Sequence, residues 1–98
     1  MAFTQTMTVQ ASSPAALVDL LEGWHRDQHG VAPGYEGARL LADRSRPGRF
    51  VIEVDFSSQE AAQQNDGRKE TRAWADRLAH LSQGQPEYHD YEVAYLTG

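Results

Sequence analysis

Apolar and polar side chains alternate along four segments of the chain, which is the pattern of a half-buried β-strand. The segments are residues 3–10, 35–43, 49–56 and 87–95. In the third, large apolar residues take every second position: Phe50, Ile52, Val54 and Phe56. The positions between them include Glu53 and Asp55, so these two carboxylates point to one face of the strand. We expect the apolar faces of the four strands to form the core.

Two further regions repeat apolar residues at helical spacing. Ser13 suits a helix N-cap and Pro14 the first helical position. An apolar stripe follows at i, i+3, i+4 and i+7: Leu17, Leu20, Leu21 and Trp24. The second region, about 58–82, is interrupted at residues 65–67, so we predict one short helix to residue 65 and another from residue 68. The inner stripe of the later helix comprises Thr71, Trp74, Ala75, Leu78 and Leu81.

The predicted order is strand, helix, strand, strand, helix, strand. This order is typical of the ferredoxin-like α+β fold, a four-stranded antiparallel sheet with both helices on one face. The 98 residues suffice for one domain, and we expect residues 1–98 to form it. The helices leave one sheet face uncovered. That face either meets water or packs on a second copy of the chain and encloses a cavity.

Composition excludes several function classes. The net charge is −5 with a single lysine and no basic run, which argues against binding of nucleic acid. The absence of cysteine excludes disulfides, thiolate metal sites and a cysteine nucleophile. No apolar run reaches the roughly 20 residues of a membrane span. The first ten residues lack a signal pattern, so we expect a cytoplasmic protein without membrane contact. The residues alone name no reaction.

Four strings of the sequence resemble a known superfamily. They are FTQTMTV, APGYEGARLLAD, GRFVIEVDFSSQEAAQQN and YEVAY, and together they span nearly the whole chain. They are similar to the dimeric α+β barrel superfamily, near its antibiotic-biosynthesis-monooxygenase-like branch. The resemblance implies a homodimer whose two sheets form a barrel, with a ligand pocket between helices and sheet or inside the barrel. Some relatives oxidise polycyclic aromatic compounds without metal or flavin, whereas others degrade haem, cyclise or dehydrate small molecules, or have no known activity.

The resemblance makes Asn65 and Trp74 candidate catalytic residues, because an asparagine and a tryptophan help such oxygenases hold the substrate. Alternatively, Asn65 caps the short helix and Trp74 is a core residue. His89 is a third catalytic candidate, since a histidine can act as acid or base near neutral pH. Its neighbours Tyr88 and Tyr91 would contact the substrate. The alternative places His89 in the sheet or at a dimer interface.

Charged residues on the strands give two further candidates for substrate contact, Arg39 and Glu53. Glu53 and Asp55 could form an acid–base pair if their face is buried. Alternatively, they pair with Arg39 and with a dimer partner. His25 and His29 have the i, i+4 spacing of two metal ligands, but no third ligand is evident. His80 invites comparison with haem-degrading relatives, although its spacing from Trp74 is too short. We therefore expect no metal and no cofactor.

Two functional hypotheses follow. The chain could be an enzyme resembling cofactor-independent monooxygenases that act on an aromatic or polyketide-like compound. An electron-rich phenolate can itself reduce dioxygen, so the protein would mainly orient the substrate and exclude water. Alternatively, the chain could be a non-catalytic small-molecule-binding or stress-related dimer with the same fold.

Overall fold

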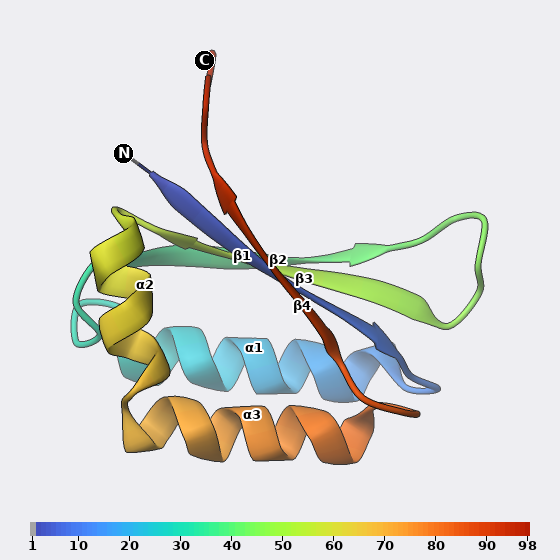
Figure 1. Ribbon diagram of the computed structural model, residues 1–98. Helices are drawn as coiled ribbons and strands as arrows, with labels where there is room; N and C mark the ends of the chain where they lie inside the picture. The colour runs from blue at the N-terminus through green and yellow to red at the C-terminus, as the bar shows by residue number, and fades with distance from the viewer. Residues whose placement is uncertain (1) are drawn as a thin grey trace.

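The computed structural model describes residues 2–98. The elements along the chain are β1 (Phe3–Gln10), α1 (Pro14–Gln28), β2 (Tyr35–Ala42), β3 (Arg49–Phe56), α2 (Gln59–Asp66), α3 (Lys69–Leu81) and β4 (Glu87–Glu92). The strands form one antiparallel sheet in the order β2-β3-β1-β4. Helices α1 and α3 lie side by side across one face, and α2 stands at one end of the sheet (Figure 1). The ferredoxin-like α+β fold predicted from the sequence is confirmed.

The predicted element boundaries hold for most of the chain. The side chains of Ser13 and Ser58 accept hydrogen bonds from the third residue of their helices, which satisfies otherwise free N–H groups. The second helical region divides as expected, and Gly67 ends α2. The last strand is shorter than predicted, because it ends at Glu92 instead of residue 95. Beyond it, residues 93–98 run away from the body of the protein (Figure 1).

The core lies between the sheet and the helices. The apolar residues predicted on β3 are buried, as are Phe3, Met7 and Val9 on β1. Four large side chains have almost no exposed surface: Leu17, Ile52, Phe56 and Leu78. Full burial of such a side chain contributes about 1.5–3 kcal/mol. This layer anchors both long helices against the sheet.

A turn between α1 and β2 depends on Gly34. Its φ of +75° lies in the left-handed region that favours glycine. A Cβ at this position would collide with the side chain of Ala61 and would lie 2.7 Å from the Ser57 hydroxyl. The carbonyl of Gly34 also accepts a hydrogen bond from the Ser57 N–H at 2.8 Å. The turn therefore packs directly on the segment that leads into α2.

Strand register decides which side chains of β4 face the helices. Tyr88 pairs with Met7 of β1, whose side chain is in the core, so Tyr88 points to the helix side. His89 pairs with Thr6 and points to the outer side. The strand therefore sends successive side chains to two different environments. Within residues 2–98, no helix is both long and apolar enough to cross a membrane.

Candidate functional site

A cavity of about 350 Å³ lies between the sheet and the helices, and we call it the interlayer cavity. Its apolar lining comes from both layers: Met7, Leu21, Trp24, Val54, Phe56, Trp74 and Ala75. Its polar lining gathers side chains from β1, β4, α2 and α3: Gln5, Asn65, Asp66, Thr71, Arg72, Tyr88 and Asp90. A mostly apolar hollow with a few converging polar groups is typical of small-molecule sites.

Two indole rings form one wall of the interlayer cavity. Trp24 comes from α1 and Trp74 from α3, and their ring centroids lie 5.8 Å apart at an interplanar angle of 59°. The indole N–H of Trp74 donates to the carbonyl of Leu20 at 3.2 Å, which fixes the ring. Both rings are buried, and the chain has no other tryptophan. The wall therefore offers a rigid aromatic surface to a flat ligand.

Asn65 is the most buried polar side chain of the interlayer cavity, with 4% of its surface exposed. Its Oδ1 accepts hydrogen bonds from the Thr71 hydroxyl at 3.1 Å and from Arg68 at 3.5 Å. These bonds join the last turn of α2 to the first turns of α3. Both use Oδ1, which leaves the Nδ2 donors for a ligand. The side chain does not cap α2, since the helix ends through backbone bonds at Gly67.

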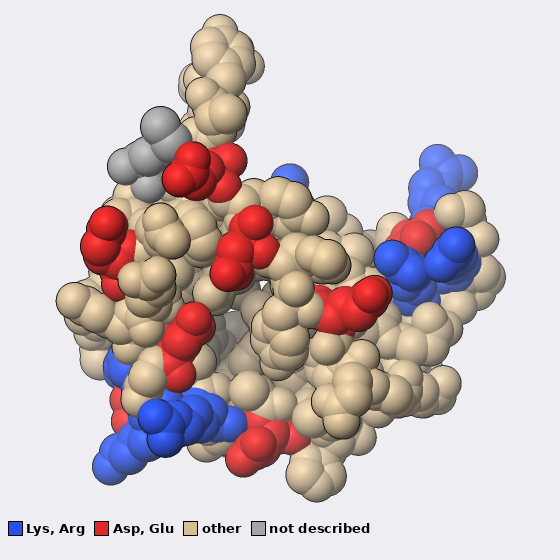
Figure 2. All heavy atoms as spheres, in the orientation of Figure 1, with Lys and Arg blue, Asp and Glu red and all other residues tan. Residues whose placement is uncertain are grey.

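Two carboxylates stand at the mouth of the interlayer cavity. Gln5 Nε2 donates to both oxygens of Asp66 at 3.4 Å. Burial raises the pKa of Asp66, the bond from Gln5 opposes this, and the charge of Asp90 adds to it. Burial and the charge of Asp66 raise the pKa of Tyr88. Figure 2 shows acidic side chains around a recess between β4 and α2 and basic side chains at its lower left, and Arg72 also lines the cavity, so charges of both signs border the mouth.

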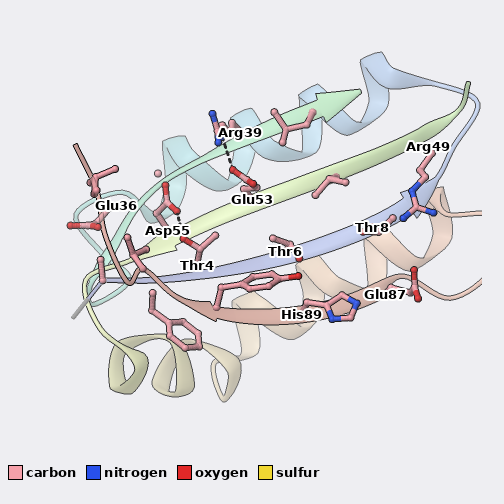
Figure 3. A pocket seen from close by; sticks show the side chains of 18 residues that line it. Thr4, Thr6, Thr8, Glu36, Arg39, Arg49, Glu53, Asp55, Glu87 and His89 are labelled. Carbon is pink, nitrogen blue, oxygen red and sulfur yellow. Dashed lines mark hydrogen bonds and ion pairs between the residues drawn. The ribbon is translucent and has the colours of Figure 1, made fainter. Parts of the chain in front are cut away.

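A second hollow, of about 900 Å³, lies on the opposite face of the sheet, and we call it the outer hollow. Figure 3 shows the row of Thr4, Thr6 and Thr8 along it, with His89 on the neighbouring strand. Glu53 accepts a hydrogen bond from Arg39 Nε at 2.6 Å, which confirms the predicted pairing. That bond and the charge of Glu53 raise the pKa of Arg39.

The second carboxylate that β3 places on this face is also engaged. Asp55 accepts a hydrogen bond from Thr4 at 2.8 Å (Figure 3). Neither Glu53 nor Asp55 is buried in this chain taken alone. The acid–base alternative considered for them required a buried face, so the geometry of the single chain favours their structural role.

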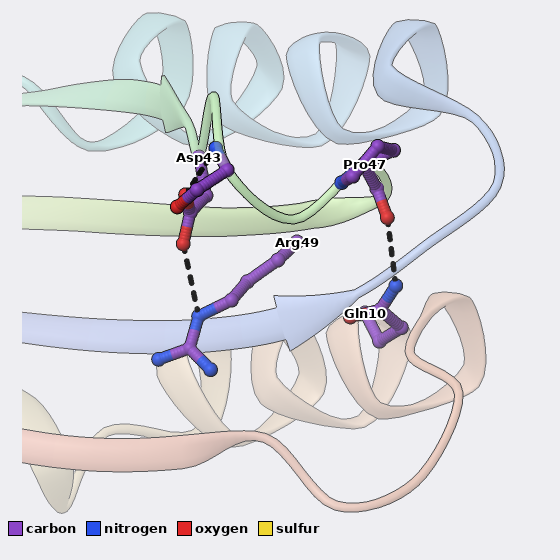
Figure 4. A network of polar contacts seen from close by, with 5 residues as sticks. Gln10, Asp43, Pro47 and Arg49 are labelled. Carbon is purple, nitrogen blue, oxygen red and sulfur yellow. Dashed lines mark hydrogen bonds and ion pairs between the residues drawn. The ribbon is translucent and has the colours of Figure 1, made fainter.

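Polar contacts fasten the hairpin at the far end of the outer hollow. Arg49 Nε lies 3.5 Å from Asp43 Oδ2, and Gln10 Nε2 donates to the carbonyl of Pro47 at 3.2 Å (Figure 4). The second bond ties the end of β1 to the loop between β2 and β3. Together these contacts tie the end of β1 and the start of β3 to the loop between β2 and β3.

The structure divides the sequence-predicted site residues between the two hollows. Asn65, Trp74 and Tyr88 line the interlayer cavity. The others line the outer hollow: Arg39, Glu53, His89 and Tyr91. The catalytic trio considered from the sequence is therefore not assembled in one place within a single chain, because His89 lies across the sheet from the other two.

Sequence reasoning missed most residues of the interlayer cavity, among them Gln5, Trp24 and Asp66. Trp24 was predicted as part of a core stripe, and nothing in a helical stripe distinguishes a cavity wall from a filled core. Gln5 carried a signal, since it is a polar residue in the apolar row of β1. Asp66 carried no signal in the sequence, because only the packing of α2 beside β1 and β4 brings it to the cavity.

The histidines considered as metal or haem ligands lie elsewhere. His25 and His29 stack with centroids 4.7 Å apart, and His25 Nδ1 lies 2.8 Å from the Tyr35 hydroxyl. His80 Nδ1 contacts the carbonyl of Asp76 at 2.7 Å on the exposed side of α3. Over residues 2–98, no three His, Asp or Glu side chains are grouped so that they could hold a metal ion.

The topology and the interlayer cavity together define a ferredoxin-like α+β protein with a hollow between its sheet and its helices. No protein-family model matches the chain, and no curated protein sequence does. Solved structures do match it over nearly its full length. A candidate antibiotic biosynthesis monooxygenase from Deinococcus radiodurans is 22% identical, with 100% of this chain and 97% of that chain covered, at a TM-score of 0.75.

Two other structures extend the comparison. SnoaB, a cofactor-independent oxygenase from Streptomyces nogalater, is 18% identical, with 97% and 93% of the two chains covered and a TM-score of 0.71. Rv0793 from Mycobacterium tuberculosis is 12% identical, with 100% of both chains covered and a TM-score of 0.77. The fold inferred from the resemblance is thus confirmed, and at these identities the fold is what the comparison shows to be shared.

Proposed function

We propose that this protein is an oxygenase that binds a small aromatic substrate in the interlayer cavity and uses no bound cofactor. The observation that carries the proposal is that Asn65 and Trp74, on two different helices, line one cavity together with Trp24. The similarity of the fold to SnoaB, a cofactor-independent oxygenase, supports the kind of chemistry. The volume of about 350 Å³ lies at the lower end of ligand pockets, so we propose a substrate of two or three fused rings.

Four residues of the cavity have assigned roles in this proposal. The indole wall of Trp24 and Trp74 orients the ring of the substrate. The free Nδ2 donors of Asn65 stabilise negative charge on a substrate oxygen, as donors of an oxyanion hole do. Tyr88, at the mouth, holds the ring in place and shields the cavity from water. The substrate then supplies the electrons that reduce dioxygen.

Oxygen consumption tests the proposal. For a naphthol, the expected reaction takes up one dioxygen and yields a naphthoquinone and one water. One atom of isotopically labelled dioxygen should appear in the quinone, as measured by mass spectrometry. Replacing Asn65 by Ala or Trp74 by Phe should lower kcat/KM about tenfold or more. Absence of any uptake above the spontaneous rate, over a panel of naphthols and naphthalenediols, would refute the oxygenase.

Strand β4 offers a matched control for the site. Tyr88 and Tyr91 are both about half exposed, at 56% and 52%, but they face opposite sides of the sheet. Tyr88→Phe should weaken substrate binding, whereas Tyr91→Phe, which faces the outer hollow, should weaken it less. The reverse order would place the substrate in the outer hollow.

The alternative function is that of a non-catalytic small-molecule binder. An oxygenase and a non-catalytic binder would both use the interlayer cavity, so ligand binding alone does not distinguish them. Both tryptophans of the chain line this cavity, and a quinone ligand should therefore quench most of the intrinsic emission. Quenching without oxygen uptake by any naphthol would favour the binder.

We also propose that two copies pair through the outer hollow. The hollow is concave and mixes threonine, charged and apolar side chains, and the tail beside it exposes Tyr95 and Leu96, each by 82%. A chain of this size without disulfides gains stability by such burial. Sedimentation at micromolar concentration should give a dimer, and Glu53→Leu should change the dimerisation constant. A stable monomer would overturn the pairing.

A further inference from the structure

The surroundings of Asp66 disfavour the negatively charged form of its carboxylate. It is the last residue of α2, where the free carbonyls of the helix carry partial negative charge. Asp90 of β4 adds a second carboxylate at the same mouth. None of the ion pairs formed within residues 2–98 includes Asp66. Arg72 of α3 lines the cavity too, but its Nη2 donates to the carbonyl of Gly67 at 3.3 Å.

The remaining contacts of Asp66 leave its oxygens free to accept a proton. Gln5 of β1 donates to both oxygens at 3.4 Å, a long distance for such a bond. Tyr88 of β4 completes the polar rim. The charge of Asp90, the end of α2 and the long bonds from Gln5 make this an unfavourable place for a carboxylate. Such locally unfavourable groups are expected at functional sites.

The neighbouring residue supplies an independent sign of a ligand. Asn65 is 96% buried, lines the cavity, and engages only its Oδ1 with Thr71 and Arg68. None of the hydrogen bonds within residues 2–98 engages its Nδ2 group, and the buried Nε1 of Trp24, on the wall of the same cavity, has no hydrogen-bond partner there either. Asn65 and Asp66 therefore present a donor and an acceptor at one end of an aromatic slot. An aromatic hydroxyl next to a carbonyl has the complementary acceptor and donor.

We propose that Asp66 accepts the hydroxyl proton of the substrate at the mouth of the interlayer cavity, which makes it the general base of the proposed oxygenase. The O–H bond of the substrate breaks, a bond from the proton to a carboxylate oxygen of Asp66 forms, and the electron pair stays on the substrate oxygen. The resulting phenolate is the species that reduces dioxygen. The inference rests on the proposed function and names its substrate class, a hydroxylated aromatic that enters in its neutral form.

The charges around Asp66 support this role. Burial and Asp90 raise the pKa of Asp66, and a stronger base removes a phenolic proton more readily. Asp66 and Asp90 outweigh the single guanidinium of Arg72 in the lining, so the cavity should favour a neutral phenol over an aromatic acid. The substrate would then be charged only after it is bound.

Kinetics of three variants test the base. Asp66→Asn keeps the shape of the side chain but cannot accept the proton, so kcat should fall about 100-fold while KM changes less. Asp90→Asn removes the same charge but leaves the base, and it should move the acid limb of the pH–rate profile to lower pH. Asp76→Asn, on the exposed side of α3 away from the cavity, should change neither. Unchanged kcat in the Asp66→Asn variant would overturn the base and leave the oxygenase standing.

Binding of para-nitrophenol gives a readout that needs no oxygen chemistry. This probe ionises near neutral pH, so calorimetry across that range compares its neutral and anionic forms. The wild-type protein should bind the neutral form at least about tenfold more tightly, Asp90→Asn should keep this preference, and Asp66→Asn should lose it. If no naphthol is oxidised, the proposed oxygenase fails, and this comparison still decides whether Asp66 accepts the hydroxyl proton of a bound phenol. Equal preference in the wild type and Asp66→Asn, or equal losses in both variants, would overturn it.

Discussion

Replacement of Asn65 by Ala separates its structural contribution from its proposed contact with a ligand. The change removes the acceptor of the Thr71 hydroxyl at 3.1 Å and of Arg68 at 3.5 Å. Such a bond contributes about 0.5–1.5 kcal/mol to stability. The bond from Arg68 adds little, because that guanidinium also pairs with Glu70 at 2.8 Å.

The net loss should be small enough for the variant to fold. Alanine favours a helix over asparagine by about 0.5 kcal/mol, which offsets part of the lost bonds. We therefore expect Asn65→Ala to lower the free energy of unfolding by at most about 1 kcal/mol. For a domain of this size, that upper value corresponds to a fall of roughly 4–8 °C in the melting temperature. Far-ultraviolet circular dichroism on heating and in urea measures both quantities.

A double-mutant cycle isolates the bond. Thr71→Val removes the same interaction from the other side, so the coupling energy with Asn65→Ala should be about 0.5–1.5 kcal/mol. A coupling near zero would show that the bond between α2 and α3 contributes nothing. If Asn65→Ala is destabilised as expected yet binds naphthols as the wild type does, Asn65 holds the helices together and does not contact the ligand.

Three further substitutions test other parts of the fold. Burial and Asp90 raise the pKa of Asp66 in the folded state above the value of about 3.9 that it has in the unfolded chain. The protonated carboxyl therefore stabilises the folded state below about pH 3.9, and this stabilisation is lost as the pH rises through the folded-state pKa. Asp66→Asn should therefore be more stable than the wild type near pH 7 in urea, with the gap closing towards pH 4; a less stable variant near pH 7 contradicts this. Gly34→Ala should cost about 3 kcal/mol, since φ is +75° and the added methyl meets Ala61; a melting temperature equal to that of the wild type would refute the tight turn. Tyr35→Phe removes the 2.8 Å bond to the partly exposed His25 and should cost at most about 1 kcal/mol in chemical denaturation, and a loss several times larger would point to another role.

The fold could be predicted from the sequence because local patterns agreed with one another. The alternation on β3, the Ser13–Pro14 start of α1 and the break after Asn65 each specify an element or its end. The last strand was predicted three residues too long, since its alternation continues past Glu92 where β1 offers no further partner.

The site could be predicted only in part. Asn65 and Trp74 come together because α2 and α3 pack at an angle that no spacing in the sequence specifies. Tyr88 and His89 were considered together as neighbours in sequence, although alternation in a strand already requires them to face opposite sides. The register with Met7 decides which of the two meets the cavity, and that is a contact between the two ends of the chain.

The pairing of the first strand with the last has a consequence for how the protein forms during synthesis. Thr8 lies opposite Glu87 in the sheet, and the N–H of Val93 donates to the carbonyl of Ala2 at 2.9 Å. Before residues 87–93 leave the ribosome, β1 is an unpaired edge with an apolar face, which is prone to pair with other chains. Contacts so distant in sequence also form slowly. A ligand therefore has no complete cavity to enter until the chain has folded to its last strand, and ligand binding reports completed folding.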